Sequence, residues 1–245
     1  MPVFRPKLAN GEIYHIYNRG VEKRTVFLSE CDYLRFIHDL FEFNDTEPVP
    51  QSNIRLLLRR PGEVDSKRLN QCLGVRPPNI KKRRELLVEL MTFSLMPNHY
   101  HLLVRQLIDG GTSLFMKKIG AGYTNYFNLK YERVGPLFQG VFKMALIKNE
   151  DHFLFIPHYI HLNCLDREEP KWREGIIENA GRAMGVLGDY RWSSYLDYIG
   201  IKNFPSVTQR DFLMEFLGGP GNYKKETWGI LKKIEIETVR PFLLE

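Results

Sequence analysis

Hydrophobic and polar positions alternate in several short segments of this chain, and each segment predicts a β-strand. Residues 12–20 alternate and end in Asn-Arg-Gly, which is typical of a strand that runs into a turn. Two more strands are predicted over 85–98 and 99–106, with a hairpin at the Pro-Asn pair where they meet. A fourth strand is predicted over 135–147, with an early bend at a glycine.

Apolar residues at helical spacing predict three main helices between and after these strands. The helices are expected over 29–43, 113–132 and 149–165. Pro157 lies inside the third, so that segment is either one kinked helix or two helices. The predicted N-terminal caps are Ser29, Thr112 and Asn149.

The resulting order is strand, helix, strand pair, helix, strand and helix. It favours an α+β fold with helices packed on a mostly antiparallel sheet. A chain of 245 residues can form one medium domain with extensions or two small domains. Residues 44–85 interrupt the core pattern as an insertion, and the polar residues 166–175 are interpreted as a linker. Residues 166–245 then form a C-terminal extension of short amphipathic segments.

The charge of the chain is concentrated in one segment. Residues 55–86 contain ten Lys and Arg against three acids, a net charge of +7, while the whole chain carries +6. A concentrated basic segment suits a polyanion such as nucleic acid. The alternative is a solvated loop whose basic residues only confer solubility.

Several protein classes are disfavoured by composition. No stretch approaches 18 uninterrupted apolar residues, and the N-terminus lacks the apolar region of a signal peptide, so we expect no membrane partner. The three cysteines are far apart and indicate neither a disulfide framework nor a zinc signature. A cytoplasmic location in a reducing environment is the simplest interpretation.

Two histidines stand out at the start of the third predicted strand. His99 and His101 are two residues apart, so their side chains project from one face of the strand. Residues 100, 102 and 104 then point to the opposite face and can be core. Two neutral imidazoles can bind one metal ion or contact one phosphate, although ordinary strands also carry such pairs. Any further ligand must come from another element.

These histidines lie in one of several segments that resemble a known family, the HUH single-tyrosine transposases. The sequence "LMPNHYHLLV" at 95–104 resembles the HUH motif. The segments "YHIYNRG" (14–20), "GPLFQGVFKMALI" (135–147) and "HYIHLNCL" (158–165) resemble the family's first strand, its later Gly-Pro strand and its nucleophile helix. "YRWSSY" (190–195) resembles a segment of REP-associated tyrosine transposases. The matches span residues 10–200 and leave out the 44–85 insertion and the C-terminal tail.

The resemblance implies a fold, a reaction and a site. It implies a ferredoxin-like HUH domain over 1–165 that cuts single-stranded DNA at hairpin-forming ends and transfers the strand through a 5′-phosphotyrosine. Tyr159 would be the nucleophile, and Asn163 would join His99 and His101 as the third ligand of Mg²⁺ or Mn²⁺. Tyr159 and Asn163 are four residues apart on a predicted helix and can therefore share a face.

Other basic residues are candidates for contacts with DNA phosphates. These candidates are Arg19, Arg105, Lys117, Lys118 and Lys143. Each could instead lie on a solvated face. The 44–85 insertion could clamp a hairpin stem. The protein could act as a monomer or as a homodimer that exchanges nucleophile helices.

The sequence also allows alternatives to this hypothesis. Tyr159 could be an ordinary core residue, and Tyr123 and Tyr126 are rival nucleophiles that sit in an aromatic pattern typical of a core or a stacking surface. His161 is expected to face away from the site, although a proton relay through it is conceivable. The chain could also be a catalytically silent DNA- or RNA-binding regulator, or a zinc-dependent hydrolase that uses the histidine pair.

Overall fold

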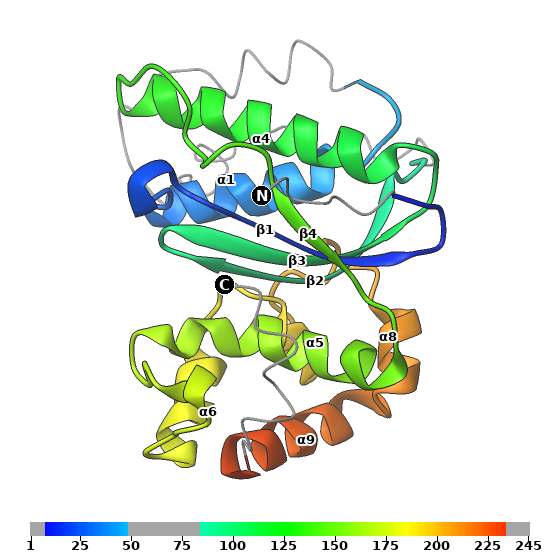
Figure 1. Cartoon of the computed structure of the whole chain (residues 1–245), viewed down its shortest axis with the longest axis vertical. Coiled ribbons are helices and arrows are strands. Elements are labelled where there is room, and N and C mark those ends of the chain that lie inside the picture. The colour runs from blue at the N-terminus through cyan, green and yellow to red at the C-terminus, as the bar shows by residue number, and fades with distance from the viewer. Residues whose placement is uncertain (1–7, 49–83, 234–245) are drawn as a thin grey trace, which may run out of the picture.

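A four-stranded antiparallel sheet forms the centre of the protein (Figure 1). The computed structural model describes residues 8–48 and 84–233. The strands are β1 (Ile13–Arg19), β2 (Val88–Met96), β3 (His99–Gln106) and β4 (Lys143–Leu146), in the spatial order β2-β3-β1-β4. With one helix after β1 and another after β3, this is the ferredoxin-like arrangement. The predicted α+β fold is confirmed.

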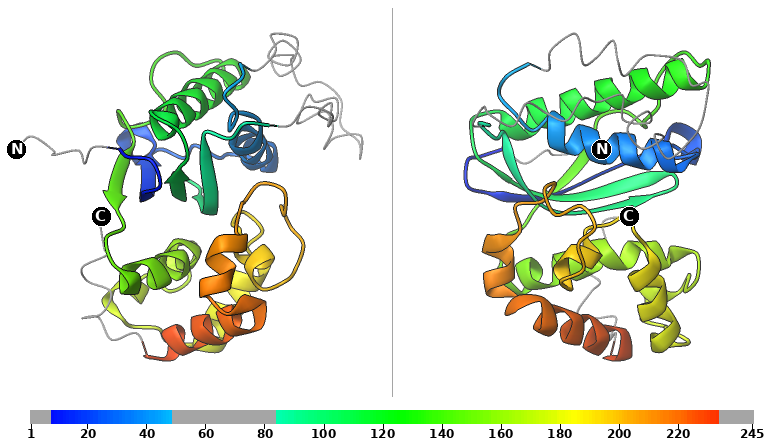
Figure 2. Two further views of the ribbon diagram at one scale, coloured as in Figure 1. Left: turned by 90° about the vertical axis from the view of Figure 1, so that its right-hand side faces the viewer. Right: turned by 180° about the vertical axis from the view of Figure 1, so that it is seen from behind.

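Helices cover both faces of the sheet (Figures 1 and 2). One face carries α1 (Glu30–Glu42) and α4 (Gly111–Lys130), and the other carries α5 (Glu150–Leu162). The C-terminal helices gather around α5 on the second face. They are α6 (Ala180–Asp189), α7 (Tyr195–Tyr198), α8 (Asp211–Phe216) and α9 (Gly219–Lys233). Short 3₁₀ turns are η1 (Val21–Lys23), η2 (Asn163–Asp166) and η3 (Trp172–Glu174).

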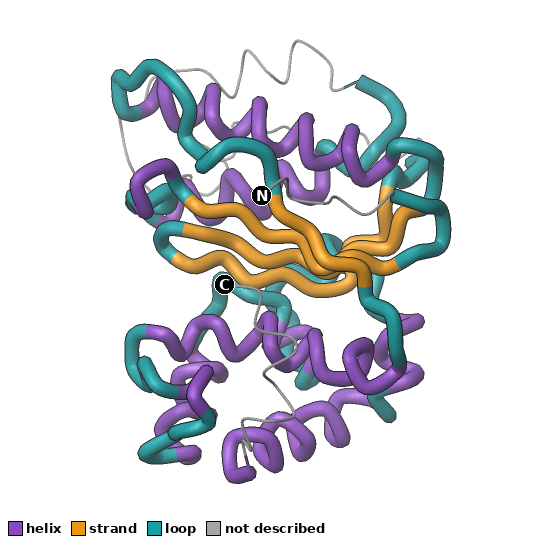
Figure 3. Tube along the Cα trace, viewed as in Figure 1, coloured by secondary structure: helices purple, strands orange, loops and turns teal. Residues whose placement is uncertain are grey.

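Two of the three predicted N-terminal caps are confirmed. Ser29 forms a capping box with Asp32, and the Asn149 side chain accepts a hydrogen bond from the His152 amide. The prediction for Thr112 is wrong, because α4 already begins at Gly111. Gly110 precedes it with a left-handed φ of 69°, which a residue with a Cβ rarely adopts. The segment around Pro157 is one continuous helix (Figure 3).

The fourth strand is shorter than predicted. Residues 135–147 form a regular strand only at Lys143–Leu146, and Phe138 makes an isolated bridge to Gly20. Gly135 and Gly140 adopt left-handed φ values of 91° and 72°, which interrupt the extended backbone before β4. The residues between them therefore run as a loop along the end of β1.

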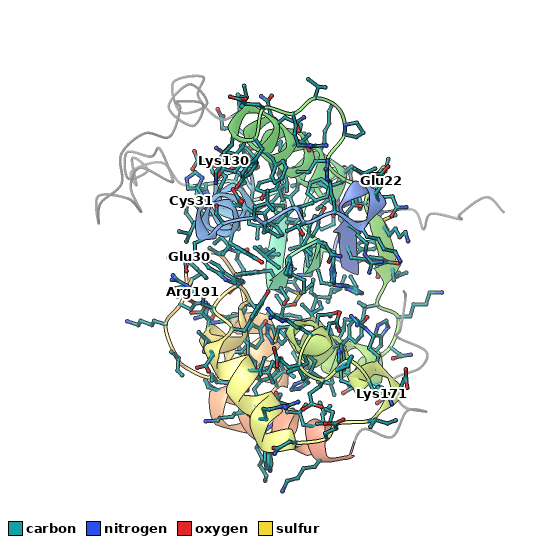
Figure 4. All side chains as sticks on the ribbon, turned by 90° about the vertical axis from the view of Figure 1, so that its left-hand side faces the viewer. Glu22, Glu30, Cys31, Lys130, Lys171 and Arg191 are labelled. Atoms are coloured by element: carbon teal, nitrogen blue, oxygen red, sulfur yellow. The ribbon has the colours of Figure 1, made fainter. Side chains whose placement is uncertain are left out.

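Alternation along the strands supplies two separate cores, one on each face of the sheet. On β3, the side chains at positions 100, 102 and 104 enter the core beneath α1 and α4, as predicted. Leu103 points the opposite way and packs with Ile156 and Ile160 of α5. The α1–α4 contact also contains a partly buried ion pair, in which Lys130 of α4, labelled in Figure 4, lies 2.6 Å from Asp32.

The C-terminal extension shares the second core with α5. Tyr195, Tyr198 and Tyr223 are fully buried there. Trp172 is 1% exposed and packs in the same core, so the interpretation of residues 166–175 as a simple polar linker is wrong.

The "YRWSSY" segment at 190–195 closes the edge of the sheet at β2. The Leu95 amide donates to the Trp192 carbonyl, and the Ser194 amide donates to the Phe93 carbonyl, each at 3.0 Å. The Trp192 ring stacks on Tyr33 of α1 at 4.5 Å. Covering an edge strand in this way removes unpaired backbone groups that would otherwise attract other strands.

Three expectations concern the chain as a whole. The 44–85 insertion lies mostly outside the described residues, since 49–83 are not described. Cys31 is disulfide-bonded, contrary to the prediction from cysteine spacing, and Cys164 is a buried free thiol. Within residues 8–48 and 84–233, no helix has both the length and the apolar character needed to cross a membrane.

Candidate active site

His99 and His101 project from the face of β3 that α5 covers. Their ring centroids are 5.2 Å apart. His101 is fully buried, and His99 is 6% exposed. On the neighbouring strand, Arg19 pairs with His99 and Tyr17 pairs with His101. The two imidazoles therefore lie together with the side chains of Tyr17 and Arg19 on the face of the sheet that α5 covers. We call this group of side chains and its surroundings the compartment.

Tyr159 reaches the same compartment from α5. Its ring lies 6.1 Å from that of His101, edge to face. Because α5 packs on this face of the sheet, the phenol and the imidazoles meet from elements that are far apart in the sequence. The Tyr159 side chain is fully buried.

His15 of β1 is a third histidine in this compartment, and sequence reasoning missed it. Its Nε2 lies 2.8 Å from His101 Nδ1, and the two rings stack at 5.0 Å. Its ring also meets Tyr159 edge-on at 5.8 Å. The available signal was the alternation of β1, which places positions 15, 17 and 19 on one face although two of them are polar.

Hydrogen bonds orient the histidine rings. His99 Nδ1 lies 2.6 Å from the side-chain oxygen of Asn98, which can only accept, so Nδ1 carries the proton. Burial, together with the positive charges of Arg173 and Arg19, lowers the pKa of His101 to about 3. His101 is therefore neutral at physiological pH.

Asn163 follows α5 directly and links Tyr159 to an arginine. Its side-chain nitrogen donates to the Tyr159 carbonyl at 2.8 Å. Its side-chain oxygen accepts a hydrogen bond from the guanidinium of Arg173, which also donates to Asp166. The guanidinium lies over the Trp172 ring at 4.9 Å.

Arg173 was not predicted as a site residue, because its segment was interpreted as a linker. Burial lowers the pKa of its guanidinium, but its interactions with Asp166 and Tyr159 raise it above its ordinary value. Arg173 thus brings a fixed positive charge to Tyr159. No local pattern marks this residue, since its role depends on the fold of the chain after α5.

A small recess opens beside His99 and brings two of the predicted DNA-binding residues together. It has a volume of about 120 Å³ and is lined by Tyr17, Asn18, Arg19, His99, Gln139 and Lys143. Lys143 also lies 5.6 Å from the Tyr17 ring centroid. Two cationic side chains therefore flank the recess at the His99 end of the compartment.

The other predicted DNA-binding residues lie elsewhere. Arg105 is on the same face, at the far end of β3, where it pairs with Glu89 and lies 4.4 Å over the Phe212 ring. Lys117 and Lys118 are on α4, on the opposite face of the sheet. Lys118 donates to the Glu47 carbonyl at 3.1 Å. The structure does not bring these three residues to Tyr159.

The rival tyrosines are core residues on the opposite face. Tyr123 donates to the Val26 carbonyl at 2.6 Å, and Tyr126 donates to Asp32 at 2.9 Å. Both pack in the core beneath α1 and α4.

His161 faces away from the compartment, as expected. Its ring nitrogens lie 2.6 Å from the Tyr223 hydroxyl and 2.8 Å from the Ser194 hydroxyl. His158 stacks on Tyr223 at 4.2 Å, with its Nδ1 2.9 Å from Thr227. These contacts fasten α5 to α7 and α9, which leaves Tyr159 facing the sheet.

Stability is expected to fall below pH 6.5. Burial lowers the pKa of His101, His158 and His161, so the unfolded chain binds protons there before the folded chain does. Each such histidine costs up to about 1.4 kcal/mol of unfolding free energy per pH unit below its ordinary pKa. Urea unfolding without divalent ions should therefore give a lower midpoint at pH 5.5 than at pH 7.5. His158→Gln should reduce this difference, and an equal or higher midpoint at pH 5.5 would contradict the argument.

Comparisons with known proteins give one distant structural match. No protein-family model matches the chain, and no curated protein matches it. A solved structure of a REP-associated tyrosine transposase bound to a REP hairpin is similar, with a TM-score of 0.47 and 14% sequence identity. The match covers 83% of this chain and 90% of that chain. A similarity at this level carries no argument about function, so the site is interpreted from its own geometry.

Proposed function

We propose that this protein cuts and rejoins single-stranded DNA through a covalent phosphotyrosine formed on Tyr159. The observation that supports this best is the meeting of one phenol with two strand-borne imidazoles in a single compartment. The ring centroids of Tyr159 and His101 lie 6.1 Å apart, with the rings edge to face. Cationic side chains flank both ends of this compartment, Arg173 at Tyr159 and Arg19 at His99. Such a site suits an anionic substrate.

The proposed reaction exchanges one phosphodiester for another. The Tyr159 oxygen attacks phosphorus, the new bond joins phosphorus to the phenol, and the bond to the 3′ oxygen breaks. The phenol loses its proton, and the departing 3′ oxygen takes one up. Attack by a second 3′-hydroxyl on the 5′-phosphotyrosine reverses the step onto another DNA end. Strand transfer therefore needs no ATP.

The two imidazoles fit a divalent cation, Mg²⁺ or Mn²⁺. His99 Nδ1 donates to Asn98, which leaves the lone pair on Nε2, and a neutral His101 whose Nδ1 donates to His15 has the same form. Hydrogen bonding through the second ring nitrogen is the usual support of a metal-binding histidine. A bound cation would neutralise charge on the phosphate. Waters and phosphate oxygens commonly complete such a site.

Asn163 fits the third ligand position less well. Its oxygen already accepts from the Arg173 guanidinium, so a dication there would lie beside a positive charge. Within the described residues, no group of three or more His, Cys, Asp and Glu side chains is arranged to hold a metal ion. The proposal therefore places the cation on His99 and His101, and the role of Asn163 as a ligand stays a prediction.

DNA must reach a phenol that is buried in this structure. Trp172 packs 5.7 Å from the Tyr159 ring, and Arg173 lies next to it. Side chains that cover the Tyr159 hydroxyl must therefore shift for a phosphodiester to enter. We propose hairpin-bearing single-stranded DNA as the substrate and the cytoplasm as the place of action.

A covalent-adduct assay tests this proposal. The full chain is incubated with a labelled oligonucleotide that carries a hairpin and a single-stranded flank, with Mg²⁺ or Mn²⁺. We expect an adduct that survives denaturant, together with a released strand that ends in a 3′-hydroxyl. Hydrolysis without an adduct would instead support a metal-dependent hydrolase.

The second candidate is a catalytically silent DNA-binding protein. The full burial of Tyr159 and the engagement of Asn163 by Arg173 favour it. Tight DNA binding without an adduct or cleavage under either metal would establish this alternative.

A further inference from the structure

Arg173 is a charged residue next to Tyr159 that is not part of the proposed metal site. It lies on η3, after the segment that leaves the end of α5. Its side chain is 23% exposed, whereas the Tyr159 side chain is fully buried. The guanidinium thus extends from the protein surface to the phenol.

Three neighbours fix the orientation of this guanidinium. Asp166 and Asn163 each accept one hydrogen bond from it, and its central carbon lies 4.9 Å from the centroid of the Trp172 ring. The Asn163 amide is itself oriented, because its nitrogen donates to the Tyr159 carbonyl at 2.8 Å. Only its oxygen can then face Arg173. An arginine held in this way loses little conformational freedom when it binds a ligand.

Arg173 pairs with the Asp166 carboxylate and also interacts with Tyr159. Asp166 also accepts from the Trp172 indole nitrogen at 2.6 Å, so its carboxylate serves two donors. The charges that act on His101 are those of Arg173 and Arg19, and both are positive. The guanidinium donates to Asn163 and Asp166, and it also interacts with the Tyr159 hydroxyl, so its position beside the phenol is set by direct contacts. This electrostatic environment favours an anion beside Tyr159.

We propose that Arg173 binds the phosphate of the DNA strand at Tyr159, and that Asn163 and Asp166 are positioning residues for its guanidinium. This inference rests on the proposed function, because it names the residue that holds the reacting phosphate. A forked guanidinium suits two phosphate oxygens and leaves the phosphorus atom facing the phenol. Arg173 acts at the phenol end of the compartment, and the histidine pair acts at the other end.

Arg173 also bridges η2 and η3, so a variant can act through the fold alone. Arg182 provides the matched control, because it forms a neighbouring ion pair with Glu169 at 3.1 Å on the exposed side of the same region. Arg182→Gln breaks that pair without touching Tyr159. Arg173→Lys keeps the charge but loses the fork and tests the specific chemistry of arginine.

The first readout is DNA binding in a Tyr159→Phe background, where no adduct can form on that residue. Fluorescence anisotropy with a labelled hairpin oligonucleotide is measured over a series of NaCl concentrations. Arg173→Gln should weaken binding by about 10-fold and reduce the slope of log K against log salt by about 0.7, the value for one phosphate contact on a single strand. Arg182→Gln should leave both quantities unchanged.

The second readout is the rate of adduct formation at saturating DNA with Tyr159 present. We expect Arg173→Gln to lower it by about 100-fold, because a charged donor at the reacting phosphate is lost. Arg173→Lys should fall between Arg173→Gln and the unsubstituted protein. Thermal unfolding of each variant shows whether the fold is kept, and Arg173→Lys carries the test if Arg173→Gln does not fold.

The outcomes separate this inference from the proposed function. If the unsubstituted protein forms no adduct but Arg173→Gln still lowers the salt slope, the proposed reaction fails and the phosphate contact stands. If the adduct forms and both arginine variants match the unsubstituted protein in rate and slope, the inference is overturned. Equal losses in Arg173→Gln and Arg182→Gln would likewise overturn it, because they would show a purely structural role.

Discussion

Replacing Tyr159 by phenylalanine is expected to abolish the covalent protein–DNA adduct while DNA binding is retained. The substitution removes one oxygen atom and keeps the ring that packs between His15, His101 and Trp172. Phenylalanine has no oxygen that could attack the phosphorus atom. Adduct formation should therefore drop by on the order of 10³-fold or more. Denaturing gel electrophoresis with a labelled oligonucleotide measures the adduct, and anisotropy measures binding.

Tyr123→Phe is the matched control for this prediction. Tyr123 is a fully buried phenol on the opposite face of the sheet, and its hydroxyl bonds the Val26 carbonyl. Losing that bond costs about 1 kcal/mol of stability but removes no group from the compartment. The adduct should persist in Tyr123→Phe. An adduct that persists in Tyr159→Phe and disappears in Tyr123→Phe would show that Tyr123 is the nucleophile.

Replacing His99 and His101 together by alanine is expected to produce the second-largest loss. The double variant removes both proposed metal ligands and also breaks the contact of His101 with His15. Changes in the groups that merely support a metal ligand cost about 10- to 100-fold in affinity, so losing two ligands should lower Mn²⁺ affinity by more than ~100-fold. Adduct formation should then fall below detection at micromolar Mn²⁺.

Metal binding is measured separately from activity, by titration of Mn²⁺ against the Tyr159→Phe protein with and without the two histidines. His38→Ala is the control, because His38 lies on α1 on the other side of the sheet and is only partly buried. It should bind Mn²⁺ as the unsubstituted protein does. Unchanged Mn²⁺ affinity in the double histidine variant would show that the metal does not bind at these histidines. Arg173 and Arg19 would then be the positively charged groups of the compartment.

Much of the fold follows from short-range pattern. The alternation over 12–20 and 99–106 predicts β1 and β3, because a strand side chain depends mainly on which face of the sheet its position meets. The caps at Ser29 and Asn149 mark where α1 and α5 begin, because each cap bonds backbone groups only a few residues away. The pattern failed at 135–142, where two glycines with left-handed backbone override an apolar segment.

The candidate site divides in the same way. Spacing alone places His99 and His101 on one face. Spacing does not reveal that Tyr17 and Arg19 pair with these histidines, since that depends on the register between β1 and β3. It also does not reveal that Lys117 and Lys118 lie across the sheet from Tyr159. Basic residues look alike in a sequence, and only the layer to which each helix belongs separates them.

The α+β order of elements, the two-residue spacing of the histidines and the helix that carries Tyr159 all follow from the amino-acid sequence. Three features depend on the packing of the whole chain: His15 stacks on His101, Arg173 turns back onto Asn163 and Tyr159, and the phenol is buried. The two groups of features differ in the sequence distance over which their interactions act. Alternation and capping arise from interactions within a few residues, whereas these contacts join segments that meet only after the helices have packed on the two faces of the sheet.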